Sequence, residues 1–141
     1  MSDAHTEVLV FIDEFCDPAR PVSDDDDLFA VQGIEGDDAG DFMEAFFARF
    51  GVDATNYLWY FHHGEEGQNF GAIFHKPIHQ RFGRIPITVA VLTEAARTRR
   101  WPISYPVHRV PRHRWDILVN QNFVGVILIG LAAGAWIRFA W

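Results

Sequence analysis

The feature that most constrains this chain is an apolar segment at its C-terminal end. From Phe123 to Trp141 there are nineteen residues, and Arg138 is the only charged one. At about 1.5 Å per residue, a helix over this segment is roughly 28 Å long, close to the hydrocarbon thickness of a bilayer. Apolar residues occupy every side of such a helix, so it has no face suited to water. The segment therefore predicts a single C-terminal transmembrane helix.

Further features of this tail suit a membrane. Gly130 and Gly134 follow the small-xxx-small pattern, which lets helices approach closely and allows a homodimer through the tail. Aromatic residues gather at the far end, where interfacial aromatics sit, and Arg138 can extend its charge towards water. We therefore expect a membrane-contacting set, made of Phe123, Gly130, Gly134, Trp136 and Phe139.

The flanking charges predict an orientation for the tail. Arg109, Arg112 and Arg114 precede it, and the positive-inside rule then places the N-terminal domain in the cytoplasm. A soluble cytoplasmic protein is the alternative, because the apolar run 124–137 has only the length of a buried core helix. We favour the membrane because the domain ahead of the tail can close a core of its own.

Charge is divided unevenly along the chain. Residues 1–70 hold 17 acidic and 2 basic residues, whereas residues 71–141 hold 2 acidic and 10 basic ones. An acidic head repels the phosphates of nucleic acid and suits a basic protein partner. The basic stretch "HRVPRHRW" lies beside the apolar tail, so it fits anionic lipid headgroups better than nucleic acid.

Apolar residues at three- and four-residue steps predict helices ahead of the tail. We expect the first over residues 6–16, with Thr6 as its N-cap. The second begins near residues 36–38 and ends at Gly51, a natural C-terminal stop. The third follows a cap at Thr88 and is ended by Pro102. The fold class is therefore mainly all-α.

Three parts follow from this pattern: a helical domain (1–101), a basic Pro/Arg-rich neck (102–116) and the hydrophobic tail helix (117–141). Within the domain, "NYLWYFHH" is either a short strand or a short helix. The glycines and prolines of residues 63–86 indicate mostly loop. Leu28 and Phe29 follow a run of four aspartates, and we expect both to be buried against the domain.

Two stretches, "DDDDLFAVQGIEGDDAGDFMEAFFARFGVD" and "PITVAVLTEAA", carry a family resemblance. Their order resembles that of an acyl carrier protein, in which a "DSL" triplet opens helix two and a "T-V-x-x-L" helix comes last. Here "GDDAGDFMEAFFARF" and "TVAVL" stand in those places. More closely, about residues 6–101 are similar to an uncharacterised bacterial family, domain of unknown function 1493, which shares "G-I-x-G-D-D-A". The resemblance implies a small carrier-like helical bundle.

The serine that acyl carriers modify has no counterpart in this pattern. Counting back from Phe50 places it near Gly36, and "EGDDAG" contains none; the chain's serines are Ser2, Ser23 and Ser104. Phosphopantetheine attachment needs a hydroxyl at the start of that helix. No cofactor is therefore expected from the resemblance.

The acidic start of the second helix is the remaining candidate site. We predict that it docks a basic protein partner through Asp37, Asp38, Asp41 and Glu44. The same acids also favour the helix dipole, a purely structural role. The expected function is a non-enzymatic, carrier-like interaction module tethered at the cytoplasmic membrane face.

Two other functions stay open. A metal-dependent enzyme is one, because zinc ligands are often histidines and acids, here His62, His63, Glu65, His75 and His79. Pro77 lies inside the second histidine pair and makes a helix carrying both doubtful. A true acyl carrier, modified at an unexpected serine such as Ser23, is the other.

Overall fold

The chain is mainly helical, as the sequence predicts. A computed structural model describes residues 3–17, 19–65 and 70–140. Within these ranges there is no β-strand, only an isolated parallel bridge between Asp53 and Arg100. The chain forms two compact units, one from residues 1–66 and 82–108 and the other from residues 67–81 and 109–141.

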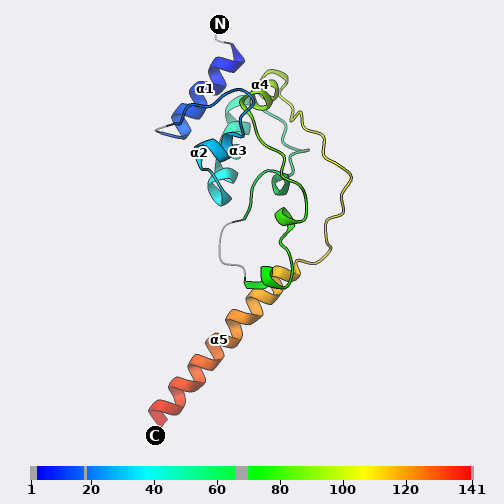
Figure 1. Cartoon of the computed structure of the whole chain (residues 1–141). Helices are drawn as coiled ribbons and strands as arrows, with labels where there is room; N and C mark the ends of the chain where they lie inside the picture. The colour runs from blue at the N-terminus through cyan, green and yellow to red at the C-terminus, as the bar shows by residue number, and fades with distance from the viewer. Residues whose placement is uncertain (1–2, 18, 66–69, 141) are drawn as a thin grey trace. The chain divides into compact units, whose positions relative to one another are not determined.

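Four α-helices and a short 3₁₀ helix build the first unit (Figure 1). They are α1 (Ala4–Phe15), α2 (Leu28–Gln32), α3 (Gly36–Phe50), η1 (Trp59–Phe61) and α4 (Val89–Thr98). The buried side chains of the four α-helices form one hydrophobic cluster, and its centre is aromatic. Phe11 of α1 meets Phe42 and Phe46 of α3 edge to face, with ring centroids 5.1 and 5.8 Å apart. Such pairs add to the stabilisation from apolar burial.

α1 begins earlier than predicted, so the assignment of Thr6 as N-cap is wrong. Asp3 occupies the N-cap position. Thr6 lies within the first turn, which the Glu7 N–H closes by donating to the Asp3 carbonyl at 3.0 Å. The predicted apolar face is confirmed, since Val8, Phe11 and Ile12 are buried.

α2 is a helix that the sequence pattern did not indicate. Its N-cap is Asp27, the last of the four aspartates, whose carboxylate accepts a hydrogen bond from the Ala30 N–H at 3.4 Å. Gly33, with a φ of 74°, ends it in the left-handed conformation that glycine favours. The expected burial of Leu28 and Phe29 is confirmed. Five residues are too few to show a helical period.

α3 and α4 follow their predicted capping signals more closely. α3 ends at Gly51, which has a φ of 63°. At the start of α4 the Thr88 hydroxyl accepts a hydrogen bond from the Val91 N–H at 3.2 Å, which confirms Thr88 as the cap. Pro102, however, does not end α4. The helix stops at Thr98 because Arg99 turns to a left-handed φ of 55°.

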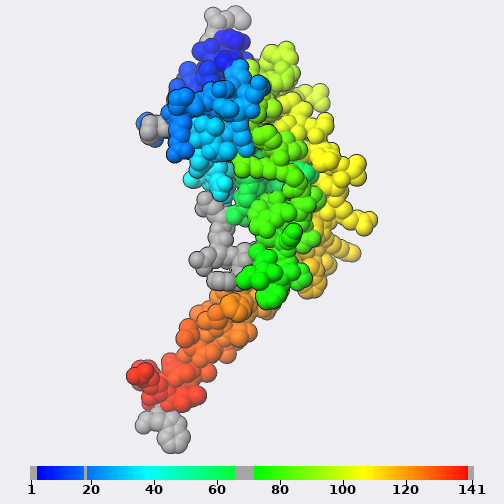
Figure 2. All heavy atoms as spheres, in the orientation of Figure 1, coloured from blue at the N-terminus to red at the C-terminus, as the bar shows by residue number. Residues whose placement is uncertain are grey.

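The second unit contains η2 (Phe70–Ile73), η3 (Ile78–Gln80) and α5 (Trp115–Ala140), with η2 packed against α5. α5 begins at Trp115, inside the stretch predicted as neck, and Arg114 pairs with Asp116 across its start at 2.8 Å. From Trp115 to Phe139 the helix is long and apolar enough, by length and composition, to cross a membrane, with a mean hydropathy of 1.8. Figure 2 shows the uncovered side chains of its orange-to-red part.

Candidate functional site

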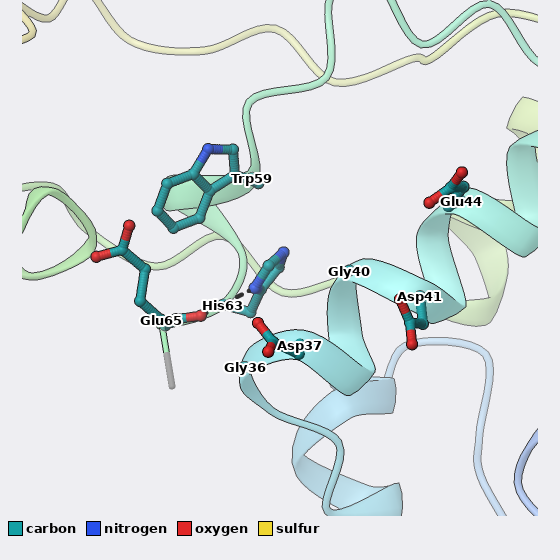
Figure 3. Close-up of a pocket in the computed structure, with 9 residues that line it drawn as sticks. Gly36, Asp37, Gly40, Asp41, Glu44, Trp59, His63 and Glu65 are labelled. Atoms are coloured by element: carbon teal, nitrogen blue, oxygen red, sulfur yellow. Dashed lines mark hydrogen bonds between the residues drawn. The ribbon is translucent and has the colours of Figure 1, made fainter. Parts of the chain in front are cut away.

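One side of α3 forms the wall of an open groove in the first unit (Figure 3). The groove has a volume of about 510 Å³. Its lining includes four carboxylates and two aromatic rings, from Asp37, Asp41, Glu44, Glu65, Trp59 and His63. None of the described lining residues is a lysine or an arginine. The groove is therefore suited to a cation.

The spacing along α3 explains why three of these acids share one side. Asp37, Asp41 and Glu44 are separated by four and three residues, so they lie one above the other on a helix. The opposite side carries Phe42 and Phe46, which are fully buried in the core. Because the phenylalanines are buried in the core, the acids on the opposite side of α3 face solvent.

Gly40 lies among the acids in the wall of the groove and adds no side chain to it. A Cβ atom placed on Gly40 would meet nothing within 4 Å. Since the residue lines the groove, a larger side chain at this position would project into free space there.

The facing wall comes from η1 and the residues after it. The rings of Trp59 and His63 lie 5.6 Å apart between centroids and are tilted by 40°. His63 donates from Nδ1 to the Gly64 carbonyl at 3.1 Å, which orients its ring. Figure 3 shows Glu65 on the same side as Trp59, across from the α3 helix.

The adjacent histidine, His62, points into the core and is only 1% exposed. Its Nδ1–H donates to the Ile85 carbonyl at 2.8 Å, and its Nε2 accepts from the Tyr105 hydroxyl at 2.7 Å. Burial lowers the pKa of His62 to about 4. The ring is therefore neutral at pH 7, with both nitrogens used by the protein.

Tyr105 extends this hydrogen-bonded network. Its hydroxyl oxygen accepts from the Trp101 Nε1–H at 2.8 Å and from the Leu58 N–H at 3.2 Å. Tyr57 stacks on the His62 ring with an interplanar angle of 2°. The network joins residues 57–62, which lead into the groove wall, to residues 101–105.

Comparison with known protein families identifies a region that contains most of the first unit and the η2–η3 segment of the second. The model of the family described as "Protein of unknown function (DUF1493)" matches residues 3–103. The chain belongs to this family. No curated protein and no solved structure matches the chain. The DUF1493 region contains α1 to α4 and every residue that lines the groove, whereas α5 follows it.

Within the DUF1493 region, the structure brings together three of the four acids predicted on the second helix. Asp38 is exposed but lies a further 100° or so around α3 from Asp37. It lines a different hollow, with Phe15 and Arg20. Sequence reasoning missed Trp59 as a groove residue and considered Glu65 only as a metal ligand, because folding, not spacing, brings them opposite α3.

The predicted histidine cluster is divided between the units. His62 and His63 belong to the first unit, and His75 and His79 to the second. In the described part of the chain, no group of three or more His, Cys, Asp or Glu side chains could hold a metal ion. Ser23, the alternative modification site, is exposed in a turn before α2, where its N–H donates to the Asp26 carboxylate at 2.9 Å.

Proposed function

We propose that the DUF1493 domain is a non-enzymatic, carrier-like interaction module whose acidic groove docks a basic segment of a protein partner. The observation that carries this proposal is the convergence of Asp37, Asp41 and Glu44 with Glu65 and Trp59 on one open groove. Opposite charge draws in the basic partner, and groove shape limits which segments fit.

An arginine side chain is the ligand that this chemistry suits best. A guanidinium group can donate two parallel hydrogen bonds to one carboxylate and stack on an indole face at the same time. Asp37 and Trp59 line the same groove and supply those two surfaces. Because the carboxylates are exposed, each contact contributes only about 0.2–1 kcal/mol. Several together favour fast and selective docking over tight binding.

Two features support a carrier-like module that carries no prosthetic group. The resemblance to acyl carrier proteins implies a helix with an acidic start, and α3 carries Asp37 and Asp38 in its first turn. The place where the resemblance implies a modifiable serine is taken by Gly36, whose φ of 56° favours glycine and strains a serine. We propose that the helix kept its recognition role and lost its attachment role.

Tethering completes the proposal. α5 spans the membrane once, and Arg109 and Arg112 at its N-terminal side keep the DUF1493 domain on the cytoplasmic face. Gly130 and Gly134, both on α5, allow two copies to pair through the tail. Confinement to the membrane surface raises the effective concentration of the domain near membrane-bound partners, so weak docking suffices.

The test compares two triple variants with equal loss of charge. The groove variant is Asp37→Asn, Asp41→Asn and Glu44→Gln. The control variant is Asp13→Asn, Asp25→Asn and Asp38→Asn, at exposed acids that do not line the groove. The probe is a fluorescent peptide of alternating arginine and alanine, followed by anisotropy at low salt with the detergent-solubilised full chain.

We expect the groove variant to weaken peptide binding roughly tenfold, from the loss of three exposed pairs, and the control variant to have a much smaller effect. Equal weakening by both variants would mean a diffuse charge effect and no docking groove. Intact mass after incubation with a phosphopantetheinyl transferase is the companion measurement. A mass increase lost on Ser23→Ala would make the protein a true carrier and overturn the proposal.

A further inference from the structure

We propose that the second unit contacts lipid through a surface outside the tail. Ile73 and Phe74, at the end of η2, lie with Trp115 in the headgroup region of the bilayer that α5 crosses. This inference rests on the proposed function, since it takes α5 as a membrane helix. It adds a second, peripheral attachment to the single spanning helix.

Exposure of large apolar side chains is the first argument. Ile73, the last residue of η2, is 77% exposed, and Phe74, which follows it, is 74% exposed. Trp115 is 53% exposed and Leu118 is 40% exposed. Scattered apolar residues are common on protein surfaces, but a contiguous set marks a contact with a partner or a membrane.

The second argument is the position of these residues beside α5. η2 packs against this helix, and Figure 1 shows the green coil of η2 next to the first turns of α5. The His75 ring lies 6.4 Å from the Trp115 ring. The polar residues Asn120, Gln121 and Asn122 follow, and the uninterrupted apolar run starts at Phe123. The polar residues therefore mark the headgroup level, and η2 lies at the membrane surface.

The charge of the segment around Ile73 and Phe74 favours lipid over another protein as the contact of these residues. Residues 70–81 contain Lys76 and Arg81 and no acidic residue. Arg81 donates from Nε to the Lys76 carbonyl at 2.8 Å, which holds the two basic residues near each other in the loop after Phe74. Exposed aromatic and aliphatic side chains beside basic ones are the composition of interfacial segments, in which the apolar part enters the boundary and the cations meet anionic headgroups.

The test places an environment-sensitive fluorophore on single cysteines of the full chain, with Cys16→Ser as background. The labelled sites are Phe74→Cys, Ile129→Cys in the middle of α5, and Asp25→Cys on the exposed surface of the first unit. Each protein is reconstituted in vesicles of phosphatidylcholine and phosphatidylserine, and its emission, quenching by aqueous iodide and quenching by lipid-attached nitroxide are measured.

We expect position 74 to show blue-shifted emission, several-fold weaker iodide quenching than position 25, and strongest quenching from nitroxides near the headgroups. If position 129 is quenched by deep nitroxides while position 74 behaves as position 25 does, the inference fails and the spanning helix stands. If position 129 is also open to iodide, the membrane part of the proposed function fails with it. Protection of position 74 from iodide without nitroxide quenching indicates a protein contact and overturns the inference.

Discussion

The Tyr105 hydroxyl donates a hydrogen bond to Nε2 of His62 at 2.7 Å, joining residues 43 positions apart in the chain. The imidazole can accept this bond only while it is neutral. On its other side the ring already donates to the Ile85 carbonyl. One hydroxyl and one ring therefore hold the wall of the acidic groove to the segment that leaves the first unit.

Removing the hydroxyl should destabilise the first unit. Tyr105→Phe leaves His62 Nε2, the Trp101 indole N–H and the Leu58 N–H without their shared partner. We expect the free energy of unfolding to fall by about 2–4 kcal/mol, measured by urea unfolding of the full chain in mild detergent. Tyr60→Phe is the matched control, because its hydroxyl serves only the His108 ring at the domain edge. Similar losses in both variants would contradict a special role for the network.

The neutral state of His62 predicts a stability that depends on pH. Its pKa falls from 6.5 to about 4 on folding, so the unfolded chain takes up the proton first as the pH drops. The contribution of His62 to stability is complete above about pH 6.5 and declines towards pH 4, by about 3 kcal/mol in all. Urea unfolding between those pH values measures the decline. It should flatten in His62→Gln, whereas His113→Gln, at an exposed position outside the first unit, should keep it.

Gly40 offers a way to close the groove without removing charge. Gly40→Ala should stabilise α3 by about 0.5–1 kcal/mol, because glycine is unfavourable inside a helix and the added methyl group meets nothing. Gly40→Phe should also fold. It should weaken binding of the arginine–alanine peptide, because the phenylalanine ring occupies the space between Asp37 and Glu44. Unchanged binding to Gly40→Phe, with folding confirmed by circular dichroism, would place the docking site elsewhere.

Arg99 is the one described non-glycine residue with a positive φ, at 55°. A left-handed conformation costs roughly 1–2 kcal/mol for an ordinary residue, so Arg99→Gly should raise the free energy of unfolding by about 0.5–1 kcal/mol. Arg97→Gly, within α4, should lower it by about 1 kcal/mol. Thermal unfolding of the two variants checks the opposite signs.

A chain ending at Arg114 lacks α5 and should leave the membrane fraction. The full chain should instead sediment with membranes and resist extraction by alkaline carbonate, because a spanning apolar helix is held by burial in the hydrocarbon. If alkaline carbonate extracts the full chain from the membrane, α5 does not span the bilayer and contacts it only peripherally.

Local signals in the sequence predicted those parts of the fold that local chemistry decides. The glycine stop at Gly51, the threonine cap at Thr88 and the buried period of Phe42 and Phe46 need no knowledge of distant residues. Thr6 misled because a threonine within the first turn looks the same as one before it. α2 was missed because its capping aspartate stands in a run of four.

The groove shows where sequence reasoning stops. The helical period places Asp37, Asp41 and Glu44 on one side and moves Asp38 away, and that much was available from spacing alone. Nothing local indicates that Trp59 faces them. Its position follows from contacts of the His62 network with Ile85 and Tyr105, far along the chain.

The route of the chain out of the DUF1493 domain has a mechanical consequence. Residues 101–108 are the last part of the first unit before the chain continues towards α5. Tyr105 is hydrogen-bonded to His62 and Leu58, and His108 to the Tyr60 hydroxyl at 2.8 Å. A pull exerted through α5 therefore reaches the hydrogen bond between His108 and Tyr60 first and Tyr105 next. The hydrogen bonds of Tyr105 to His62 and Leu58 must then both break before residues 101–105 can separate from residues 58–62.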